Sequence, residues 1–319
     1  MSMRRIGFAV INLALVAATA WSAPALAQTQ QQDWCYKDGA THEQTIEGCA
    51  AVLESPQTSS KNRALARHNR GIAHYNLGID HLNEEDYDRA IASFDKAIED
   101  MPEDPDSFID RGVAYHRRGD DDKAIADYSH AINLDREQSR AFYNRGLVWR
   151  QKGHHARAMA DYDEAIRLQP DDPDAFNSRG FAHSQQGDHE RAIADYDLAI
   201  TLDAGHVVAL ANRCWSHFVL GRLSAAVADC DEALRLYPSS ATVLNRRGNA
   251  HLKLGNYVLA IADFNKVLEL EPANANSLFG RGVALLRSGD QARGNRDIAA
   301  AKKIDPGVAK RYALYGVRS

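Results

Sequence analysis

Arginine and aspartate, the residue types best suited to ion pairing, recur periodically along this chain of 319 residues. The arginines are Arg70, Arg111, Arg145, Arg179, Arg213, Arg247 and Arg281, spaced by 34 from Arg111 onward. The aspartates are Asp127, Asp161, Asp195, Asp229, Asp263 and Asp297, with Ser93 in the first position. A guanidinium binds a carboxylate through two parallel hydrogen bonds, so we predict a structural ion pair in each repeat. An arginine track for an anionic ligand is the alternative, which six neutralising carboxylates disfavour.

Histidine, a possible metal ligand, recurs in the same periodic frame. The positions are His74, His183, His217 and His251. Equivalent atoms of stacked helices lie about 8–10 Å apart, whereas zinc takes nitrogen ligands at about 2 Å. We therefore expect packed histidines that bond to a neighbouring aspartate or carbonyl group, and neither a metal site nor a cofactor.

Four cysteines occupy two local pairs of positions. Cys214 and Cys230 fall in one repeat, at positions that should face each other, and Cys35 and Cys49 lie near the N-terminus. Of the three pairings that four cysteines allow, we predict disulfides within each local pair, formed in an oxidising compartment. The alternative is that Cys214 and Cys230 are small core residues in place of Gly and Tyr. Neither pair has the C-x2-C spacing of a zinc site.

The stretch Ser139–Asp172 shows which elements must position these residues. Its small and apolar residues follow a helical spacing, at Phe142, Gly146 and Trp149 and then at Ala158, Tyr162 and Ala165. Gly153 divides the stretch, because glycine readily takes the left-handed conformation that ends a helix. Pro170 ends the second half, since proline cannot continue a helix. Each repeat is therefore predicted to be a helix pair that buries its apolar face only against its neighbours.

The 34-residue period and its skeleton of Phe142, Arg145, Gly146 and Trp149, then Ala158, Tyr162, Ala165 and Pro170, resemble the tetratricopeptide repeat (TPR) family, whose pattern is W-x2-L-G-x2-Y, A-x3-F and a terminal Pro. This sequence departs from that pattern in holding Arg where the family usually has Leu. The resemblance implies an all-α fold, an α-solenoid in which 34-residue helix–turn–helix repeats stack into a right-handed superhelix. The expected domains are a signal peptide (1–27), an N-terminal cap with a partial repeat (28–63), seven repeats (64–104, 105–138, 139–172, 173–206, 207–240, 241–274, 275–306) and a C-terminal capping helix (307–319).

The first of these repeats is longer than the others. Gly71 and Ala90 are 19 residues apart, where the corresponding residues of later repeats are 12 apart. We therefore expect a seven-residue insertion around Ile79–Glu85. Because seven residues make about two helical turns, such an insertion lengthens the hairpin without rotating its apolar face.

The resemblance also implies a ligand site, since TPR proteins usually bind in a groove lined by the first helix of each pair. Carried onto this sequence, the groove residues are Ile72, Val113, Tyr143, Leu147, Phe181, Trp215, Phe218, Asn245, Asn249, Phe279 and Val283. We expect a largely apolar stripe that binds a peptide or protein segment, centred on Trp215 and Phe218. The aliphatic members are equally consistent with packing against neighbouring helices. The lysine of the family's chaperone-tail clamp is not matched at the flanking positions.

The N-terminus has the pattern of an export signal. Met1–Arg5 contains two arginines, Ile6–Ala20 is almost wholly apolar, and Ala25–Ala27 offers small residues at a cleavage point. We predict cleavage after Ala27 and a periplasmic location, with secretion as the alternative. An uncleaved anchor is disfavoured by an apolar run of about 15 residues, which is short for a membrane span. No other stretch is expected to cross a membrane.

Charge and motif content narrow the functional classes. Without Arg4 and Arg5, 36 basic and 43 acidic side chains remain, a net charge of about −7 that argues against nucleic-acid binding. The patterns G-x-S-x-G, P-loop and H-E-x-x-H are absent, and the segments outside the repeats are short for a catalytic domain. We therefore predict a non-enzymatic interaction scaffold of the cell envelope. A self-associating assembly factor that uses its end faces is the alternative.

Overall fold

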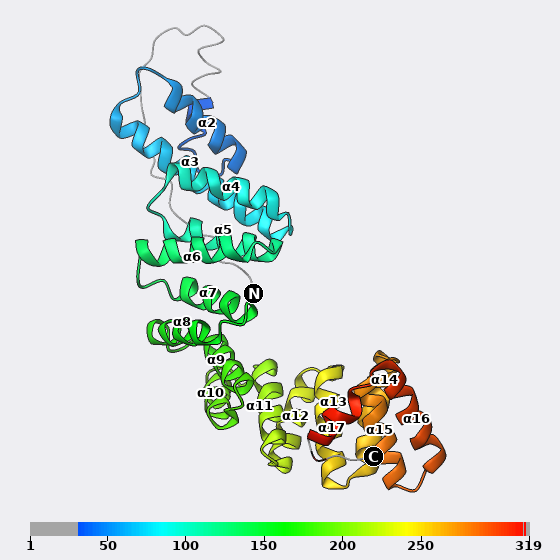
Figure 1. The fold of residues 1–319 in the computed structure, drawn as a ribbon. Coiled ribbons are helices and arrows are strands. Elements are labelled where there is room, and N and C mark those ends of the chain that lie inside the picture. Colours follow the sequence, from blue (N-terminus) through cyan, green and yellow to red (C-terminus); the bar gives the residue numbers. More distant parts are fainter. Residues whose placement is uncertain (1–30, 315, 317–319) are drawn as a thin grey trace. The chain divides into compact units, whose positions relative to one another are not determined.

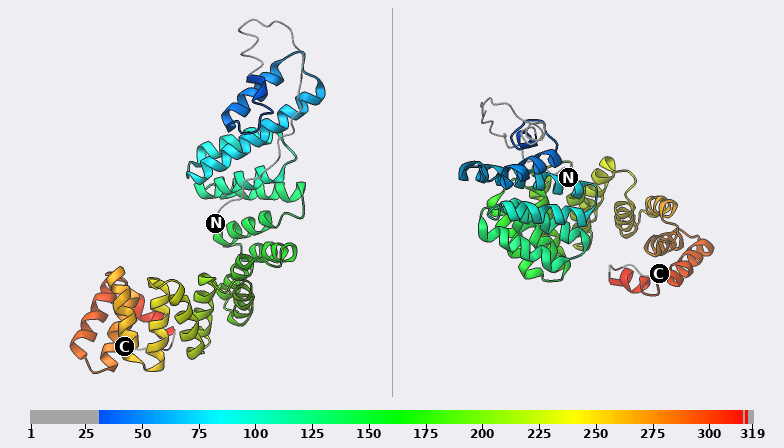
Figure 2. Two further views of the ribbon diagram at one scale, coloured as in Figure 1. Left: turned by 180° about the vertical axis from the view of Figure 1, so that it is seen from behind. Right: turned by 90° about the horizontal axis from the view of Figure 1, so that it is seen from above.

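The structure, a computed structural model, describes residues 31–314 and residue 316. These residues form helices and no strands, which confirms the predicted all-α solenoid of helical repeats (Figures 1 and 2). None of the described helices is both long and apolar enough to span a membrane. The predicted signal peptide, residues 1–27, lies outside the described residues.

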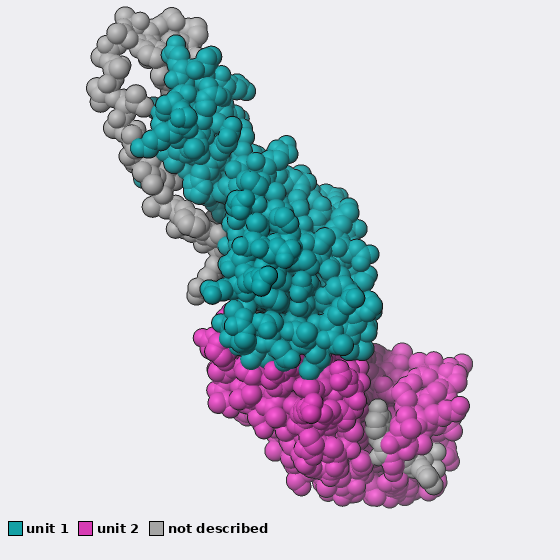
Figure 3. All heavy atoms as spheres, turned by 60° about the vertical axis from the view of Figure 1, so that its left-hand side comes forward, with its two compact units in different colours: residues 1–168 teal, residues 169–319 magenta. Residues whose placement is uncertain are grey.

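The chain divides into two compact units, residues 1–168 and 169–319 (Figure 3). In unit 1, α3 packs on α2 and α4, α5 on α6 and α7 on α8. Its helices are α2 (His42–Glu54), α3 (Ser60–Asn83), α4 (Tyr87–Asp100), α5 (Pro105–Arg118), α6 (Asp121–Leu134), α7 (Ser139–Gln151) and α8 (His155–Leu168).

Unit 2 repeats the same arrangement, with α17 after the last pair. The first helices of successive pairs, α9, α11, α13 and α15, also contact one another, and α17 packs on α15 and α16. The helices are α9 (Pro173–Gln185), α10 (His189–Leu202), α11 (Val207–Val219), α12 (Leu223–Leu236), α13 (Ala241–Leu254), α14 (Tyr257–Leu270), α15 (Ala275–Arg287), α16 (Gln291–Ile304) and α17 (Val308–Leu314).

Local sequence signals set the ends of these helices. The chain turns within a pair at glycines with positive φ, for example 99° at Gly119 and 81° at Gly255. Helices α8, α12, α14 and α16 each end two residues before a proline. Aspartate caps several helices; Asp188, for instance, accepts a hydrogen bond from the main-chain N–H of Arg191.

In most of the pairs the two helices meet where a glycine faces an aromatic ring. A Cβ atom added at Gly146 would lie 2.8 Å from the ring of Tyr162, and one at Gly248 would lie 2.9 Å from Phe264. Both rings are fully buried. Only glycine permits this approach, since any side chain would push the helices apart.

The first repeat of unit 1 corrects the predicted insertion. The glycine that faces its aromatic ring is Gly78, whose added Cβ would lie 2.6 Å from Phe94, and Gly78 and Ala90 have the usual spacing of 12. Glu85 has a φ of 61° at the turn where later repeats have glycine. The prediction of an insertion around Ile79–Glu85 is therefore wrong. The extra residues form the start of α3, which packs on α2.

The same correction moves three predicted columns by seven residues in the first repeat. The predicted positions are counted from Gly71, whereas the structure shows that Gly78 is the glycine equivalent to those of later repeats. Arg70 pairs with Asp100, at 2.8 Å for Nε–Oδ2 and 2.7 Å for Nη2–Oδ1, and not with Ser93. The residues that occupy the arginine, histidine and groove columns of this repeat are Leu77, His81 and Ile79, in place of Arg70, His74 and Ile72.

Two disulfides cross-link the chain, Cys35–Cys49 and Cys214–Cys230. The second joins α11 to α12 at the positions that hold glycine and an aromatic ring in other repeats, and both of its cysteines are fully buried. A covalent bond therefore replaces the glycine–ring contact in this pair. Closing a loop of this length stabilises a fold by about 3 kcal/mol in the chain-entropy model.

Substitution of Gly78 and Gly71 by alanine should test the corrected register. We expect Gly78→Ala to destabilise unit 1 by about 1–3 kcal/mol, because the new methyl group meets the rigid ring of Phe94. Gly71→Ala meets the flexible side chain of Met101 and gains helix propensity, so its effect should be small. Urea unfolding followed by circular dichroism measures both. A larger loss for Gly71→Ala would contradict the register.

Candidate binding site

Each arginine of the column from Arg111 to Arg281 donates two hydrogen bonds to the aspartate 16 residues later. In the pair Arg111–Asp127, the Nε–Oδ2 and Nη2–Oδ1 distances are 2.8 and 2.7 Å. The other five pairs have the same two contacts, at distances between 2.6 and 3.1 Å: Arg145–Asp161, Arg179–Asp195, Arg213–Asp229, Arg247–Asp263 and Arg281–Asp297. The fork of each guanidinium thus joins the two helices of its own pair.

Several of these arginines also reach the preceding helix pair. Nη1 of Arg247 donates to Asp231 at 2.6 Å, and Nη1 of Arg145 donates to the Ser129 hydroxyl at 2.9 Å. The hydrogen bonds that Arg247 donates to Asp263 raise the pKa of Arg247, against the effect of burial. Because these guanidinium groups are occupied by the chain's own acceptors, the column connects repeats and offers little to a ligand.

The substitution Asp263→Asn should show how much such an ion pair contributes to the stability of the fold. Asp263 is 3% exposed, and the amide cannot balance the charge of Arg247. We expect the free energy of unfolding to fall by about 2–3 kcal/mol. This is less than the loss expected for a fully buried ion pair, because Arg247 is partly exposed and retains its ion pair with Asp231. Glu232→Gln, which alters an exposed pair with Arg235, should leave the urea midpoint unchanged. An unchanged midpoint for Asp263→Asn would refute this role.

The histidine column lies beside the same carboxylates. Nε2 of His217 is 3.8 Å from Asp229, and Nε2 of His183 is 3.9 Å from Asp195. Burial lowers the pKa of His217 and of His251, although a neighbouring aspartate opposes the shift in each case. Among the described residues, no three His, Cys, Asp or Glu side chains are grouped closely enough to hold a metal ion.

The lowered pKa of His251 predicts a pH dependence of stability. Below the unfolded-state pKa of about 6.5, the unfolded chain binds a proton that the folded chain resists, so stability should fall as the pH falls from 7 to 5. His251→Gln should reduce this slope, whereas His155→Gln, at an exposed position, should not. Urea midpoints measured at pH 7, 6 and 5 test both variants. An equal slope for His251→Gln and the parent would exclude the effect.

Three predicted groove residues belong to the core of unit 2. Phe218, Phe279 and Val283 are each 1% exposed, so a ligand cannot reach them. Phe218 packs in the cluster around the Cys214–Cys230 disulfide, and α17 covers Phe279, whose ring centre lies 4.8 Å from that of Tyr312. The prediction that these residues contact a ligand is wrong, because large apolar side chains at these positions fill the space between neighbouring helices.

The remaining apolar groove residues are half-buried in both units. They are Val113, Tyr143 and Leu147 in unit 1 and Phe181 in unit 2. Ile72, from the shifted register, lines a hollow of about 500 Å³ in unit 1 together with Tyr75 and Met101. A continuous apolar stripe is therefore not observed within either unit.

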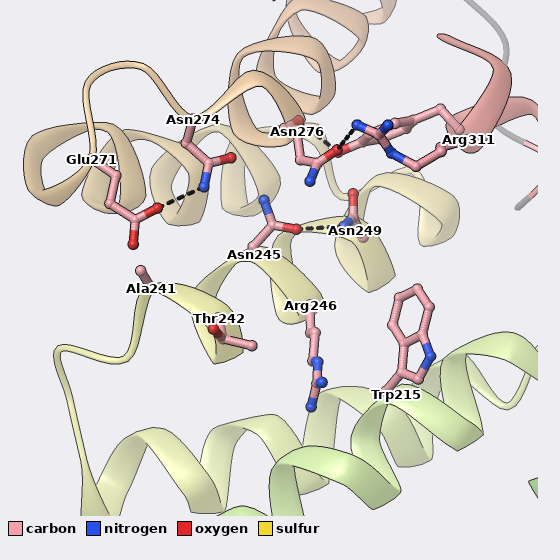
Figure 4. Close-up of a pocket in the computed structure, with 11 residues that line it drawn as sticks. Trp215, Ala241, Thr242, Asn245, Arg246, Asn249, Glu271, Asn274, Asn276 and Arg311 are labelled. Carbon is pink, nitrogen blue, oxygen red and sulfur yellow. Dashed lines mark hydrogen bonds between the residues drawn. The ribbon is translucent and has the colours of Figure 1, made fainter. Parts of the chain in front are cut away.

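The predicted residues Trp215, Asn245 and Asn249 come together around one pocket in unit 2 (Figure 4). We call it the amide pocket; its volume is about 310 Å³. Helices α11, α13, α15 and α17 and the connection from α14 to α15 form its wall. Its lining residues are Trp215, Ala241, Thr242, Asn245, Arg246, Asn249, Glu271, Asn274, Asn276, Arg311 and Tyr312.

Side-chain amides define the chemistry of this pocket. Asn245 Nδ2 donates to the Ser277 hydroxyl at 2.6 Å, and Asn249 Nδ2 donates to Asn245 Oδ1 at 2.9 Å. The buried Oδ1 of Asn249 has no hydrogen-bond partner in the described part of the chain. Such an acceptor costs about 1–3 kcal/mol unless a donor satisfies it. An N–H group of a ligand, with a small rotation of the amide, is one such donor.

Trp215 from α11 and Arg246 from α13 line the side of the pocket toward α11, below Asn245 and Asn249 in the view of Figure 4. The indole ring stacks on the buried Phe218, with 5.3 Å between ring centres, and the guanidinium lies 5.9 Å from the indole centre. Phe218 therefore supports one face of the indole ring, and Trp215 itself remains partly exposed. A fixed aromatic face of this kind suits ligand binding, because little side-chain entropy is lost on contact.

Sequence reasoning did not identify Thr242, Arg246, Asn276 or Arg311 as part of this site. In the column that precedes the repeated arginines, earlier repeats have Asn144 and Asn212 where this repeat has Arg246. The two consecutive arginines, Arg246 and Arg247, are the sequence feature that could have indicated this part of the site. Arg311 could not be inferred from repeats, because it belongs to α17.

Family models match most of the helical region. The tetratricopeptide repeat is matched over residues 75–138, 179–241 and 241–274, and the TPR repeat over 148–187. Together these matches cover more than half of the chain, which therefore belongs to the tetratricopeptide repeat family. Scaffolds of this family are protein-interaction modules and are generally non-catalytic. No curated protein sequence matches the chain.

Solved structures show the same fold. YrrB, described as a TPR protein with an unusual peptide-binding site, is 22% identical, with a TM-score of 0.51 over 58% of this chain and 95% of its own. A tetratricopeptide repeat protein from Parabacteroides merdae is 18% identical, with a TM-score of 0.57 over 77% and 99%. PilF of Pseudomonas aeruginosa is 19% identical, with a TM-score of 0.58 over 66% and 96%. At these identities the likeness concerns the fold alone.

Proposed function

We propose that this chain is a non-catalytic scaffold that binds an extended polypeptide segment in the amide pocket of unit 2. The observation that carries the proposal is the set of side-chain amides that line the pocket together with the partly exposed Trp215. An amide side chain contains both a donor and an acceptor, and so it matches the N–H and C=O groups of an extended backbone. The indole face adds apolar contact area for one side chain of the segment.

The compartment that we propose is the cell envelope, in the periplasm, with secretion as the alternative. Both disulfides support an oxidising environment, where such bonds persist. The apolar segment 6–20, preceded by two arginines, supports export. A polypeptide ligand also agrees with the family, and YrrB, a relative in fold, is described as having a peptide-binding site.

A blocked pocket tests this proposal. Peptides of 12 residues are first selected from a random library on the full chain, and their affinities are then measured by fluorescence anisotropy. Thr242 is exposed and lines the pocket, so Thr242→Trp fills it without removing a core contact. We expect at least a tenfold loss of affinity, since a single blocked anchor costs more than about 1.4 kcal/mol.

Thr201→Trp is the matched control. Thr201 is exposed on α10, outside the pocket, and its variant should bind like the parent. Peptides that bind Thr242→Trp and the parent equally would overturn the proposal. Molar mass measured over a range of protein concentrations separates the alternative, a self-associating factor, which predicts assembly that Thr242→Trp leaves intact.

A further inference from the structure

Two turns of unit 2 expose apolar side chains where the corresponding turns of other helix pairs are polar. The turn from α11 to α12 reads VLGRLS, and the turn from α13 to α14 reads KLGNYVL. The corresponding turns of four other pairs read RRGDDD, QKGHHA, QQGDHE and RSGDQA. Side chains that are exposed at such turns add little to the core, so the packing of the protein does not account for them.

Five exposed residues make up this feature, which we call the apolar edge: Val219, Leu220, Leu254, Val258 and Leu259. Val258 is 78% exposed, and the exposed fractions of the other four lie between 37% and 52%. Of the 12 large apolar residues that are exposed in the described part of the chain, these five are gathered in two turns. Single exposed apolar residues are normal, whereas a group with a polar rim marks a surface that binds a partner or a membrane.

The two turns of the apolar edge are neighbours in space. Nζ of Lys253, at the end of α13, lies 4.9 Å from the centre of the Phe218 ring, at the end of α11. Helix α13 also packs on both α11 and α12. Phe218 directly precedes Val219, and Lys253 directly precedes Leu254. The exposed residues of both turns therefore belong to one surface of unit 2.

The charged residues of this surface are basic, although the chain as a whole is acidic. Between residues 219 and 228 the one charged residue is Arg222, and between residues 252 and 262 it is Lys253. The formal net charge of the chain is −5. Aliphatic side chains beside cations complement an anionic lipid surface, where apolar acyl chains lie beneath a layer of phosphate groups.

The carboxylates of the adjoining turns are already paired. Glu190 accepts a hydrogen bond from Nη2 of Arg222 at 2.6 Å, and Asp290 pairs with Arg293 at 3.6 Å. Both pairs are exposed, and such pairs contribute little to stability, so phosphate groups compete readily with Glu190 for Arg222. Lys253 contacts the Phe218 ring and supplies a second cation.

The size of the apolar edge favours a lipid surface over a second protein chain. A stable protein–protein interface takes about 20–30 residues from each partner. The apolar edge has five exposed apolar residues. A fluid bilayer needs no matching contour, and a few inserted side chains together with cations give reversible attachment.

We propose that the apolar edge of unit 2 attaches this chain to an anionic lipid surface. Leu220, Leu254 and Val258 enter the boundary between headgroups and acyl chains, and the Lys253 ammonium group stays at the level of the phosphates. The attachment lies on the bilayer and does not span it. None of these residues lines the amide pocket, so the inference goes beyond the proposed function and does not depend on it.

Binding to vesicles tests this inference. The chain from residue 28 onward contains every described residue and lacks the apolar segment 6–20, which could itself bind lipid. It is sedimented with vesicles of phosphatidylcholine that contain about one-third phosphatidylglycerol. We expect binding to these vesicles and much weaker binding to pure phosphatidylcholine. The double variant Leu220→Ser, Val258→Ser should bind roughly 10- to 100-fold more weakly, because two inserted side chains are lost.

The double variant Leu202→Ser, Val208→Ser is the matched control. Leu202 and Val208 are 44% and 55% exposed, and they lie at the end of α10 and the start of α11, away from the apolar edge. This variant removes the same two types of side chain from unit 2, so it should bind vesicles like the parent.

A second pair of variants tests the cation. Lys253→Gln should weaken binding to the anionic vesicles roughly fivefold, the effect of one cation near such a surface. Lys266→Gln removes the same charge from an exposed position further along α14, outside the apolar edge, and should change binding little. Circular dichroism spectra and urea midpoints of all variants show whether any loss is due to unfolding.

Three outcomes would overturn the inference. The first is that the parent does not bind, or that it binds no better than Leu220→Ser, Val258→Ser. The second is equal binding to neutral and anionic vesicles, which would leave the cations without a role. The third is self-association of the parent that this double variant abolishes, since a second chain would then cover the apolar edge. Peptide binding in the amide pocket should be the same in the parent and this variant, so the two proposals can fail separately.

Discussion

The close approach of a glycine to an aromatic ring is the contact on which the rest of this structure depends. Gly146 allows the ring of Tyr162 to enter the space between two helices, and the same contact recurs through both units. Once the helices are this close, residues 16 apart face each other. Arg145 and Asp161 can then form two hydrogen bonds, which a wider helix pair would not allow. Apolar packing therefore sets the distance between the two helices of a pair, and the ion pairs form at that distance.

Substitutions in this pattern keep the geometry by other means. Cys214 and Cys230 replace the glycine and the ring with a covalent bond at the same place between the helices. Glu85 turns the chain with a positive φ where its counterparts are glycines, at a cost on the order of 1 kcal/mol. In both cases the neighbouring pairs maintain the helix positions, because each repeat is stabilised mainly by its interfaces.

The amide pocket depends on which residues such packing leaves exposed. Large apolar side chains on the first helices, such as Phe218 and Phe279, are drawn into the core, since burying each contributes about 1.5–3 kcal/mol. Polar residues and the supported face of Trp215 remain at the surface. Helix α17 both covers the last pair and adds Arg311 to the wall. A capping element therefore also shapes the site.

The sequence by itself determined the helical repeat, the turns and the facing positions of residues such as Arg111 and Asp127, because these depend on local periodicity and on a spacing repeated many times. It left two frames open for the first repeat: Gly78 has the usual spacings, 34 residues before Gly112 and 12 before Ala90, whereas Gly71 requires an insertion, and contact with Phe94 selects Gly78. Nor did it separate core from surface among the apolar groove residues. Tertiary structure decided both, because burial depends on the neighbouring helix pairs and on α17, which lie far from these residues in the chain.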